Sequence, residues 1–80
     1  MDIEEELYIS RDLYLCAFLK ARGIRLVKTV KQGKIATFHF ERTEDLETLI
    51  TGFYDNTEMV GANKFVESIK NLKALIYNIK

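Results

Sequence analysis

The chain has 80 residues, about half of them apolar, and its twelve basic and twelve acidic side chains give no net charge. This length supports one hydrophobic core, so we expect a single small domain over residues 1–80 and no separate catalytic module. The sequence has no leader, no apolar run near the ~18 residues of a membrane span, and one cysteine that cannot form an internal disulfide, so we expect a cytoplasmic protein that contacts no membrane.

The first two predicted elements are a short strand and a mostly apolar helix. Residues 7–9 alternate in a way that predicts a strand. Ser10 then suits the N-cap of a helix over residues 11–22, and Gly23 suits its left-handed C-cap. Because the helix is apolar on more than one side, we expect it to be buried, with Cys16 inside it.

A β-hairpin is predicted next, with strands over residues 24–30 and 35–41. A three-residue loop at positions 31–33 collects the aromatic side chains on one face, so we expect this loop rather than a two-residue loop. The predicted pairs are Ile24 with Phe40, Leu26 with Phe38 and Lys28 with Ala36. The opposite face would carry Arg25, Val27, Thr29, Ile35, Thr37 and His39.

Two helices are predicted to end the chain. Thr43 is a candidate N-cap for an amphipathic helix over residues 44–54, and a longer helix follows over residues 62–78. The longer helix has an apolar stripe with the spacing of a coiled-coil seam: Phe65, Ile69, Leu72, Ile76 and Ile79. The stripe spans barely two heptads, which favours packing into the chain's own core, and a homodimer contact through these five residues is the alternative.

The order β-α-β-β-α-α predicts an α+β fold in which helices cover a small, mainly antiparallel sheet. Two positions for the last helix fit this order. It can cover the second face of the sheet, above Val27 and Ile35, or it can dock on another subunit.

Several segments together suggest a family. Leu7–Leu19 leads into the helix motif SRDLYLCAFLKARG, and Gly23–Val27, Phe38–Phe40 and Phe65 follow, with Leu72-Lys73 near the end. This series resembles a family of small bacterial and phage proteins known only as a domain of unknown function. Many of its members have proline shortly before the last helix, where this chain has Gly61-Ala62. The resemblance implies the fold and supplies no catalytic residue, because the shared positions are mostly core positions.

The residue types that carry chemistry do not form a recognisable site in the sequence. His39 is the only histidine and no metal-ligand residues flank it, so we interpret it as a partly exposed strand residue. Cys16 has apolar neighbours, which raise the pKa of a thiol. Gly23 and Gly33 belong to no phosphate-binding pattern. We therefore expect a protein that is not an enzyme and uses no metal and no cofactor.

Basic residues are concentrated in one part of the chain. Residues 20–34 contain six basic side chains and no acidic one, whereas residues 41–58 contain six acidic side chains and one basic. The six candidate binding residues are Lys20, Arg22, Arg25, Lys28, Lys31 and Lys34. The end of a helix and the solubility of a turn account for all of them except Arg25 and Lys28.

Two function classes fit this pattern. A non-catalytic protein-interaction or self-assembling module is preferred, with a second copy of the chain or an acidic protein as partner. The alternative is a nucleic-acid-binding accessory protein that uses the basic hairpin of residues 20–34, since a two-stranded ribbon can enter a DNA groove. The hairpin offers no exposed aromatic side chains for base stacking, which favours the first class.

Overall fold

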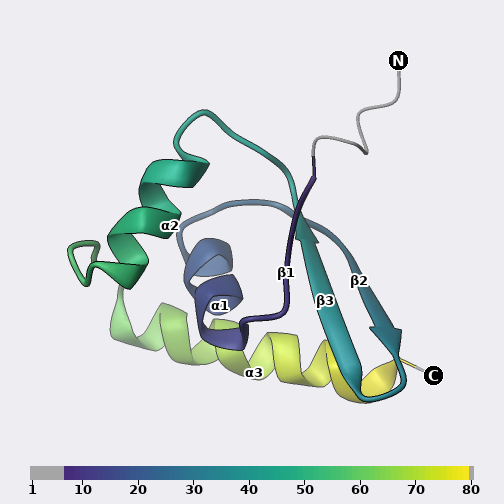
Figure 1. Ribbon diagram of the computed structural model, residues 1–80. Helices are drawn as coiled ribbons and strands as arrows, with labels where there is room; N and C mark the ends of the chain where they lie inside the picture. Colours follow the sequence, from purple (N-terminus) through teal and green to yellow (C-terminus); the bar gives the residue numbers. More distant parts are fainter. Residues whose placement is uncertain (1–6, 80) are drawn as a thin grey trace.

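A computed structural model describes residues 7–79 of the chain and confirms the predicted α+β fold (Figure 1). The elements in chain order are strand β1 (Tyr8–Ser10), helix α1 (Leu13–Ala21), strands β2 (Leu26–Gln32) and β3 (Ile35–Phe40), and helices α2 (Leu46–Tyr54) and α3 (Ala62–Asn78). The three strands form one antiparallel sheet in the order β1-β3-β2, so β3 is the central strand. The bounds of α3 are those predicted from the sequence.

Helix α1 is capped by Asp12, and the prediction of Ser10 as its N-cap was wrong. One oxygen of the Asp12 carboxylate accepts hydrogen bonds from the backbone N–H groups of Tyr14 and Leu15, each at 3.1 Å. The Ser10 hydroxyl instead accepts a bond from the backbone N–H of Asp12 at 3.1 Å. A carboxylate is the stronger acceptor for backbone N–H groups at the positive end of a helix, which explains the later start.

Helix α1 ends as predicted, at a glycine in the left-handed conformation. Gly23 has a φ of +94°, and its backbone N–H donates to the carbonyl of Lys20 at 3.0 Å. The next residue, Ile24, donates to the carbonyl of Leu19, also at 3.0 Å. These two bonds form a Schellman motif, and they direct the chain from α1 into the hairpin.

The hairpin turn is shorter than predicted. Gln32 pairs with Ile35, so the turn consists of Gly33 and Lys34 rather than residues 31–33. Gly33 has a φ of +61°, as the first residue of a type II′ turn requires, and this turn suits the twist of two antiparallel strands.

The register of the hairpin also differs from the prediction, and β2 contains a β-bulge. Leu26 pairs with Phe40 but Lys28 pairs with His39, so Val27 is an extra residue in β2. The two-residue turn, which pairs Gln32 with Ile35, sets Lys28 beside His39 on the opposite face of the sheet, and the bulge then places Leu26 beside the buried Phe40. The predicted place of Lys28 on the apolar face was therefore wrong. The place of Thr29 on the polar face was also wrong, because Thr29 pairs with the buried Phe38.

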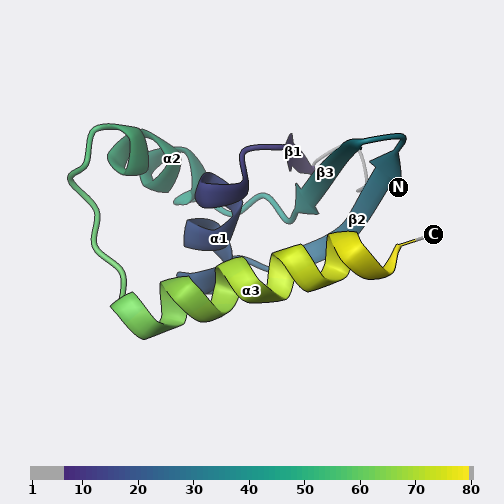
Figure 2. The same ribbon diagram turned by 90° about the horizontal axis from the view of Figure 1, so that it is seen from below.

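The core lies on the face of the sheet that carries Phe38 and Phe40. Both side chains are almost fully buried and belong to the same cluster as five residues of α1 and Leu72 of α3. Figure 2 shows α3 running past α1 and on beneath the sheet to the hairpin. Ile35 on the other face of the sheet is 49% exposed, so α3 does not cover that second face.

Helix α2 begins later than predicted. Leu46 is its first residue, and Thr43 donates its hydroxyl to the Asp45 carboxylate at 2.6 Å rather than capping the helix. At the other end, Asn56 adopts a left-handed φ of 62°, and the backbone N–H of Thr57 donates to the carbonyl of Gly52 at 2.9 Å. The helix thus ends in a second Schellman motif, which turns the chain back along α2.

Candidate interaction surfaces

The face of the sheet opposite the core is the first candidate surface. Strand pairing places seven residues on this outer sheet face: Ile9, Lys28, Val30, Gln32, Ile35, Thr37 and His39. Among residues 7–79 no helix covers it, and Ile9 and Ile35 are 54% and 49% exposed. Antiparallel sheets often have one face in water, but that face is then usually polar. Two half-exposed isoleucines therefore add apolar surface to this face.

The polar groups of the outer sheet face are partly ordered by each other. His39 Nε2 lies 3.1 Å from the Thr37 hydroxyl, which also donates to the carbonyl of Val30 at 3.5 Å. Burial lowers the pKa of His39, and the ammonium of Lys28 lowers it further. The fold therefore favours the neutral imidazole, so Lys28 supplies the positive charge of this face.

The structure divides the six candidate basic residues into two groups. Arg22 donates to the Glu58 carboxylate at 2.6 Å and to the carbonyl of Met59 at 3.0 Å, and its guanidinium lies 5.6 Å from the centre of the Phe18 ring. Lys20 is half-buried in the last turn of α1. Lys20 and Arg22 thus lie at the C-terminal end of α1, where basic side chains offset the negative end of the helix dipole, as expected from the sequence.

The other four basic residues are exposed around the hairpin and are called the hairpin cations: Arg25, Lys28, Lys31 and Lys34. None of them makes an ion pair with another of the residues that the structure describes. Lys28 lies on the outer sheet face, whereas Lys31 pairs with Ala36 and so lies on the inner face. Arg25 precedes β2, and its carbonyl accepts a hydrogen bond from the backbone N–H of Glu41 at 3.0 Å.

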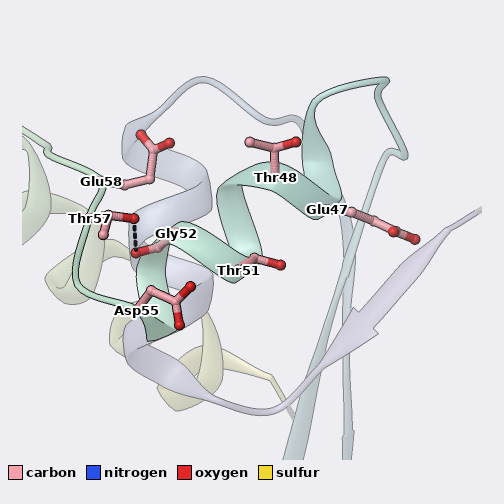
Figure 3. Close-up of a pocket in the computed structure, with 7 residues that line it drawn as sticks. All are labelled: Glu47, Thr48, Thr51, Gly52, Asp55, Thr57 and Glu58. Carbon is pink, nitrogen blue, oxygen red and sulfur yellow. Dashed lines mark hydrogen bonds between the residues drawn. The ribbon is translucent and has the colours of Figure 1, made fainter.

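A hollow beside α2 is the second candidate surface. It is open to solvent and has a volume of about 440 Å³. Its lining residues define the acidic hollow: Glu47, Thr48, Thr51, Gly52, Asp55, Thr57 and Glu58 (Figure 3). Three carboxylates and three hydroxyls give it a negative, hydrogen-bonding character. The acidic sequence of residues 41–58 indicated the charge, but no sequence pattern indicated that Glu58 folds back over α2.

Glu58 closes one side of the acidic hollow because α2 has a glycine beneath it. A Cβ atom at Gly52 would collide with the Cγ of Glu58, so the absence of a side chain at position 52 lets Glu58 lie on the helix. The backbone N–H groups of Thr57 and Glu58 both donate to the carbonyl of Gly52. Glu58 also pairs with Arg22, so this contact joins α1, α2 and the segment that follows α2.

A second contact joins α2 to the other end of α1. The Tyr54 hydroxyl donates to the Asp12 carboxylate at 2.7 Å, and this bond to a charged acceptor is the main reason that the pKa of Tyr54 is raised to about 12. Between the two contacts the rings of Phe18 and Phe53 pack with centres 5.1 Å apart. Helix α2 therefore contacts both ends of α1 and packs against its middle.

The only cysteine lies inside the core. Cys16 is fully buried, and burial raises the pKa of its thiol to about 11. Its sulfur donates weakly to the carbonyl of Ser10 at 3.8 Å. Over the described residues no group of three or more His, Cys, Asp and Glu side chains could hold a metal ion. The thiol is thus placed as a packing group rather than as a nucleophile.

Four of the five candidate dimer contacts face the protein's own core. Leu72 is fully buried, and Phe65, Ile69 and Ile76 pack against the core cluster. Ile79 is half-buried just beyond the end of α3. The exposed apolar residues of α3 are others, namely Val66, Leu75 and Tyr77. A second copy could contact only the parts of the stripe that the core leaves accessible.

These features define a small α+β domain with helices on one face of its sheet and with opposite charges at the hairpin and beside α2. The chain belongs to the family described as a domain of unknown function (DUF5659), whose model matches residues 5–78. No curated protein and no solved structure matches the chain. In the part of the chain that the structure describes, no helix is long and apolar enough to cross a membrane.

Proposed function

We propose that the protein is a non-catalytic interaction module that associates with a second copy of itself. The observation that carries this proposal is the outer sheet face, where Ile9 and Ile35 stay half-exposed although the domain has a complete core elsewhere. Contact with another protein surface would remove these side chains from water, a gross gain of about 25 cal/mol per Å² of apolar surface from which the entropic cost of association is subtracted.

The outer sheet face is a better contact surface than the apolar stripe of α3. Leu72, at the centre of the stripe, is fully buried and cannot contact another chain. Strand β2 also lies at an edge of the sheet, with one side unpaired among the described residues. Edge strands of this kind readily pair with another chain, and lysines such as Lys28 restrict which partner can approach.

Light scattering of the purified chain at tens of micromolar tests self-association. We expect a mass above that of the 9.3 kDa monomer. Ile35→Thr should lower this mass towards the monomer, because threonine suits a strand but buries less apolar surface. Val66→Thr is the matched control, since Val66 is 47% exposed on α3, and it should leave the mass unchanged. A wild-type monomer would contradict the proposal.

Nucleic-acid binding is the second candidate function. The observation in its favour is that the four hairpin cations have no carboxylate partner among residues 7–79. Neutralising about four phosphates predicts affinity that falls with salt with a log-log slope of roughly −3 to −4. Replacing all four cations by glutamine should abolish retention on a DNA column. Replacing Lys64, Lys70 and Lys73 of α3 is the control for a general loss of charge, and unchanged retention of the hairpin variant removes this candidate.

Location and origin form part of the same proposal. A buried free thiol at Cys16 suits the reducing cytoplasm. The helix motif SRDLYLCAFLKARG carries the resemblance to small bacterial and phage proteins, and we propose that origin for the chain.

A further inference from the structure

We infer that copies of this chain associate head to tail, with the outer sheet face and hairpin turn of one copy bound to the acidic hollow of the next. This inference rests on the proposed self-association and names the two surfaces that meet. The occupant of the outer sheet face is therefore the α2 side of a second copy.

The distribution of charge favours a head-to-tail contact over a symmetric contact between two outer sheet faces. Strands β1, β2 and β3 contain no acidic residue, and the outer sheet face and the turn carry Lys28 and Lys34. A symmetric contact between two outer sheet faces would bring the lysines of both copies together, and like charges across an interface are costly. The complementary charge is present in the same chain, on Glu47 and Asp55 of the acidic hollow.

Two carboxylates of the acidic hollow are available to pair with lysines of another copy. The Glu47 side chain is 87% exposed, and its contact with Arg42 is long, at 3.9 Å. A contact this exposed contributes little, so Glu47 can exchange it for a lysine of another copy at small cost. Asp55 makes no ion pair with the described residues. A volume of about 440 Å³ leaves room for side chains of the hairpin turn.

Apolar surface accompanies the charges on both sides. Ile35 directly follows the turn residue Lys34, so a lysine that reaches the acidic hollow brings a half-exposed isoleucine with it. On the other side, Met59 is 84% exposed and directly follows Glu58, a lining residue of the hollow. The two surfaces therefore match in polarity as well as in charge.

The shape of the molecule makes the contact intermolecular. In both views the hairpin turn and α2 lie at opposite ends of the domain (Figures 1 and 2). The two longer extents of the domain are 36 and 34 Å, and with the turn and α2 at opposite ends the hairpin does not reach the acidic hollow of its own chain. Two different surfaces meet, so each added copy leaves one hairpin and one hollow free. Such a contact generates a ring or an open chain of copies.

A charge-exchange experiment tests the head-to-tail contact. The first variant combines Lys28→Glu with Lys34→Glu, and the second combines Glu47→Lys with Asp55→Lys. Glu58 is left unchanged because it holds Arg22. Within each variant the two surfaces then have the same sign. We expect each variant alone to be monomeric by light scattering, and an equimolar mixture to regain assemblies of wild-type size in which the two variants alternate.

A control variant tests whether the loss of assembly depends on where the charges are changed. Lys70→Glu with Lys73→Glu, on α3, changes the charge by the same amount away from both surfaces. This variant should assemble like the wild type. Circular dichroism checks that each variant is folded. If a charge-reversed pair folds poorly, the neutral pairs Lys28→Gln with Lys34→Gln and Glu47→Gln with Asp55→Asn replace it, and each should weaken assembly.

The outcomes separate this inference from the proposed function. A wild-type chain that stays monomeric overturns both. A wild-type chain that assembles while both charge-reversed variants also assemble supports self-association and overturns the head-to-tail contact. A mixture that remains monomeric likewise overturns it, because each variant offers the other a surface of opposite charge.

Discussion

Asp12 joins two helices through a single carboxylate. One oxygen caps α1 by accepting from the backbone N–H groups of Tyr14 and Leu15, and the other accepts from the Tyr54 hydroxyl of α2. The second bond exists only while the phenol keeps its proton, and it holds the pKa of Tyr54 at about 12, above the ordinary value of 10. The link between the two helices is therefore sensitive to alkaline pH.

The contribution of Tyr54 to stability should be lost at high pH. Because its pKa is raised in the folded state, the fold favours the protonated phenol. This contribution is complete below pH 10 and disappears as the pH rises to about 12. Tyr54→Phe should remove the most alkaline step from an ultraviolet titration of tyrosine. It should also lower the free energy of unfolding at neutral pH by no more than about 1 kcal/mol, since the residue is 60% exposed.

Two further variants are compared with Tyr54→Phe. Tyr14→Phe is the matched control, because Tyr14 is 57% exposed and lies on α1, and its titration should keep the alkaline step. Asp12→Ala should cost more than Tyr54→Phe, by about 1 kcal/mol, because it also removes the helix cap. Identical titration curves for the wild type and Tyr54→Phe would contradict the assigned hydrogen bond.

The Cys16 thiol should be unreactive in the folded protein. A pKa near 11 rather than 9 leaves about one-hundredth of the usual thiolate at neutral pH, and complete burial blocks access as well. An aromatic disulfide reagent should therefore modify the native chain at least about 100-fold more slowly than the chain in denaturant. Rapid modification of the native chain would show that α1 opens readily.

At the scale of elements, the segment after α2 is held by the missing side chain of Gly52. Alanine usually stabilises a helix relative to glycine by up to about 1 kcal/mol. Here Gly52→Ala should instead destabilise the protein by about 1–3 kcal/mol, because the added Cβ displaces Glu58. In a Glu58→Ala background the sign should reverse. Urea denaturation of the four proteins measures this coupling, and the same stabilising effect in both backgrounds would disprove the contact.

The elements also show where sequence reasoning succeeds. The apolar stripe of α3, together with Gly61 before it, predicted the helix, and Gly23 predicted the end of α1, because each signal is local and strong. The strand bounds of β2 were displaced because the turn lies at Gly33 and Lys34 rather than at residues 31–33, which changes which residues share a face. The bulge at Val27 shifts the pairing once more, and the sequence from Leu26 to Lys28 does not indicate it. The start of α1 was displaced because Asp12 caps the helix in place of Ser10. The start of α2 was displaced because the Thr43 hydroxyl donates to Asp45 instead of capping, and Asp45 makes no side-chain capping bond.

The candidate surfaces were predictable only in part. Composition alone identified the basic hairpin and the acidic segment. The pairing of Arg22 with Glu58, 36 positions away, depends on how the chain returns along α2, which no periodicity encodes. Which residues lie on the outer sheet face depends on the turn at Gly33 and Lys34, so Lys28 could not be placed there before the register was known.

For the whole molecule, stability depends on a core in which α3 contacts the sheet through few residues. Leu72 is fully buried between α1 and the sheet cluster, so Leu72→Ala should cost about 2–5 kcal/mol. Leu75→Ala, one turn further on and 40% exposed, should cost less than about 1 kcal/mol. Chemical denaturation compares the two, and equal costs would mean that α3 is not anchored at Leu72. Leu72→Met preserves volume and should recover most of the loss.

The contact between Gly52 and Glu58 also limits how related sequences can diverge. A residue with a side chain at position 52 is compatible with this fold only when position 58 carries a short one, and a change at position 58 in turn frees Arg22 from its partner. Positions 22, 52 and 58 should therefore vary together across the family. An alignment in which position 52 becomes larger while position 58 remains glutamate would mean that those relatives connect α2 to α3 along a different path.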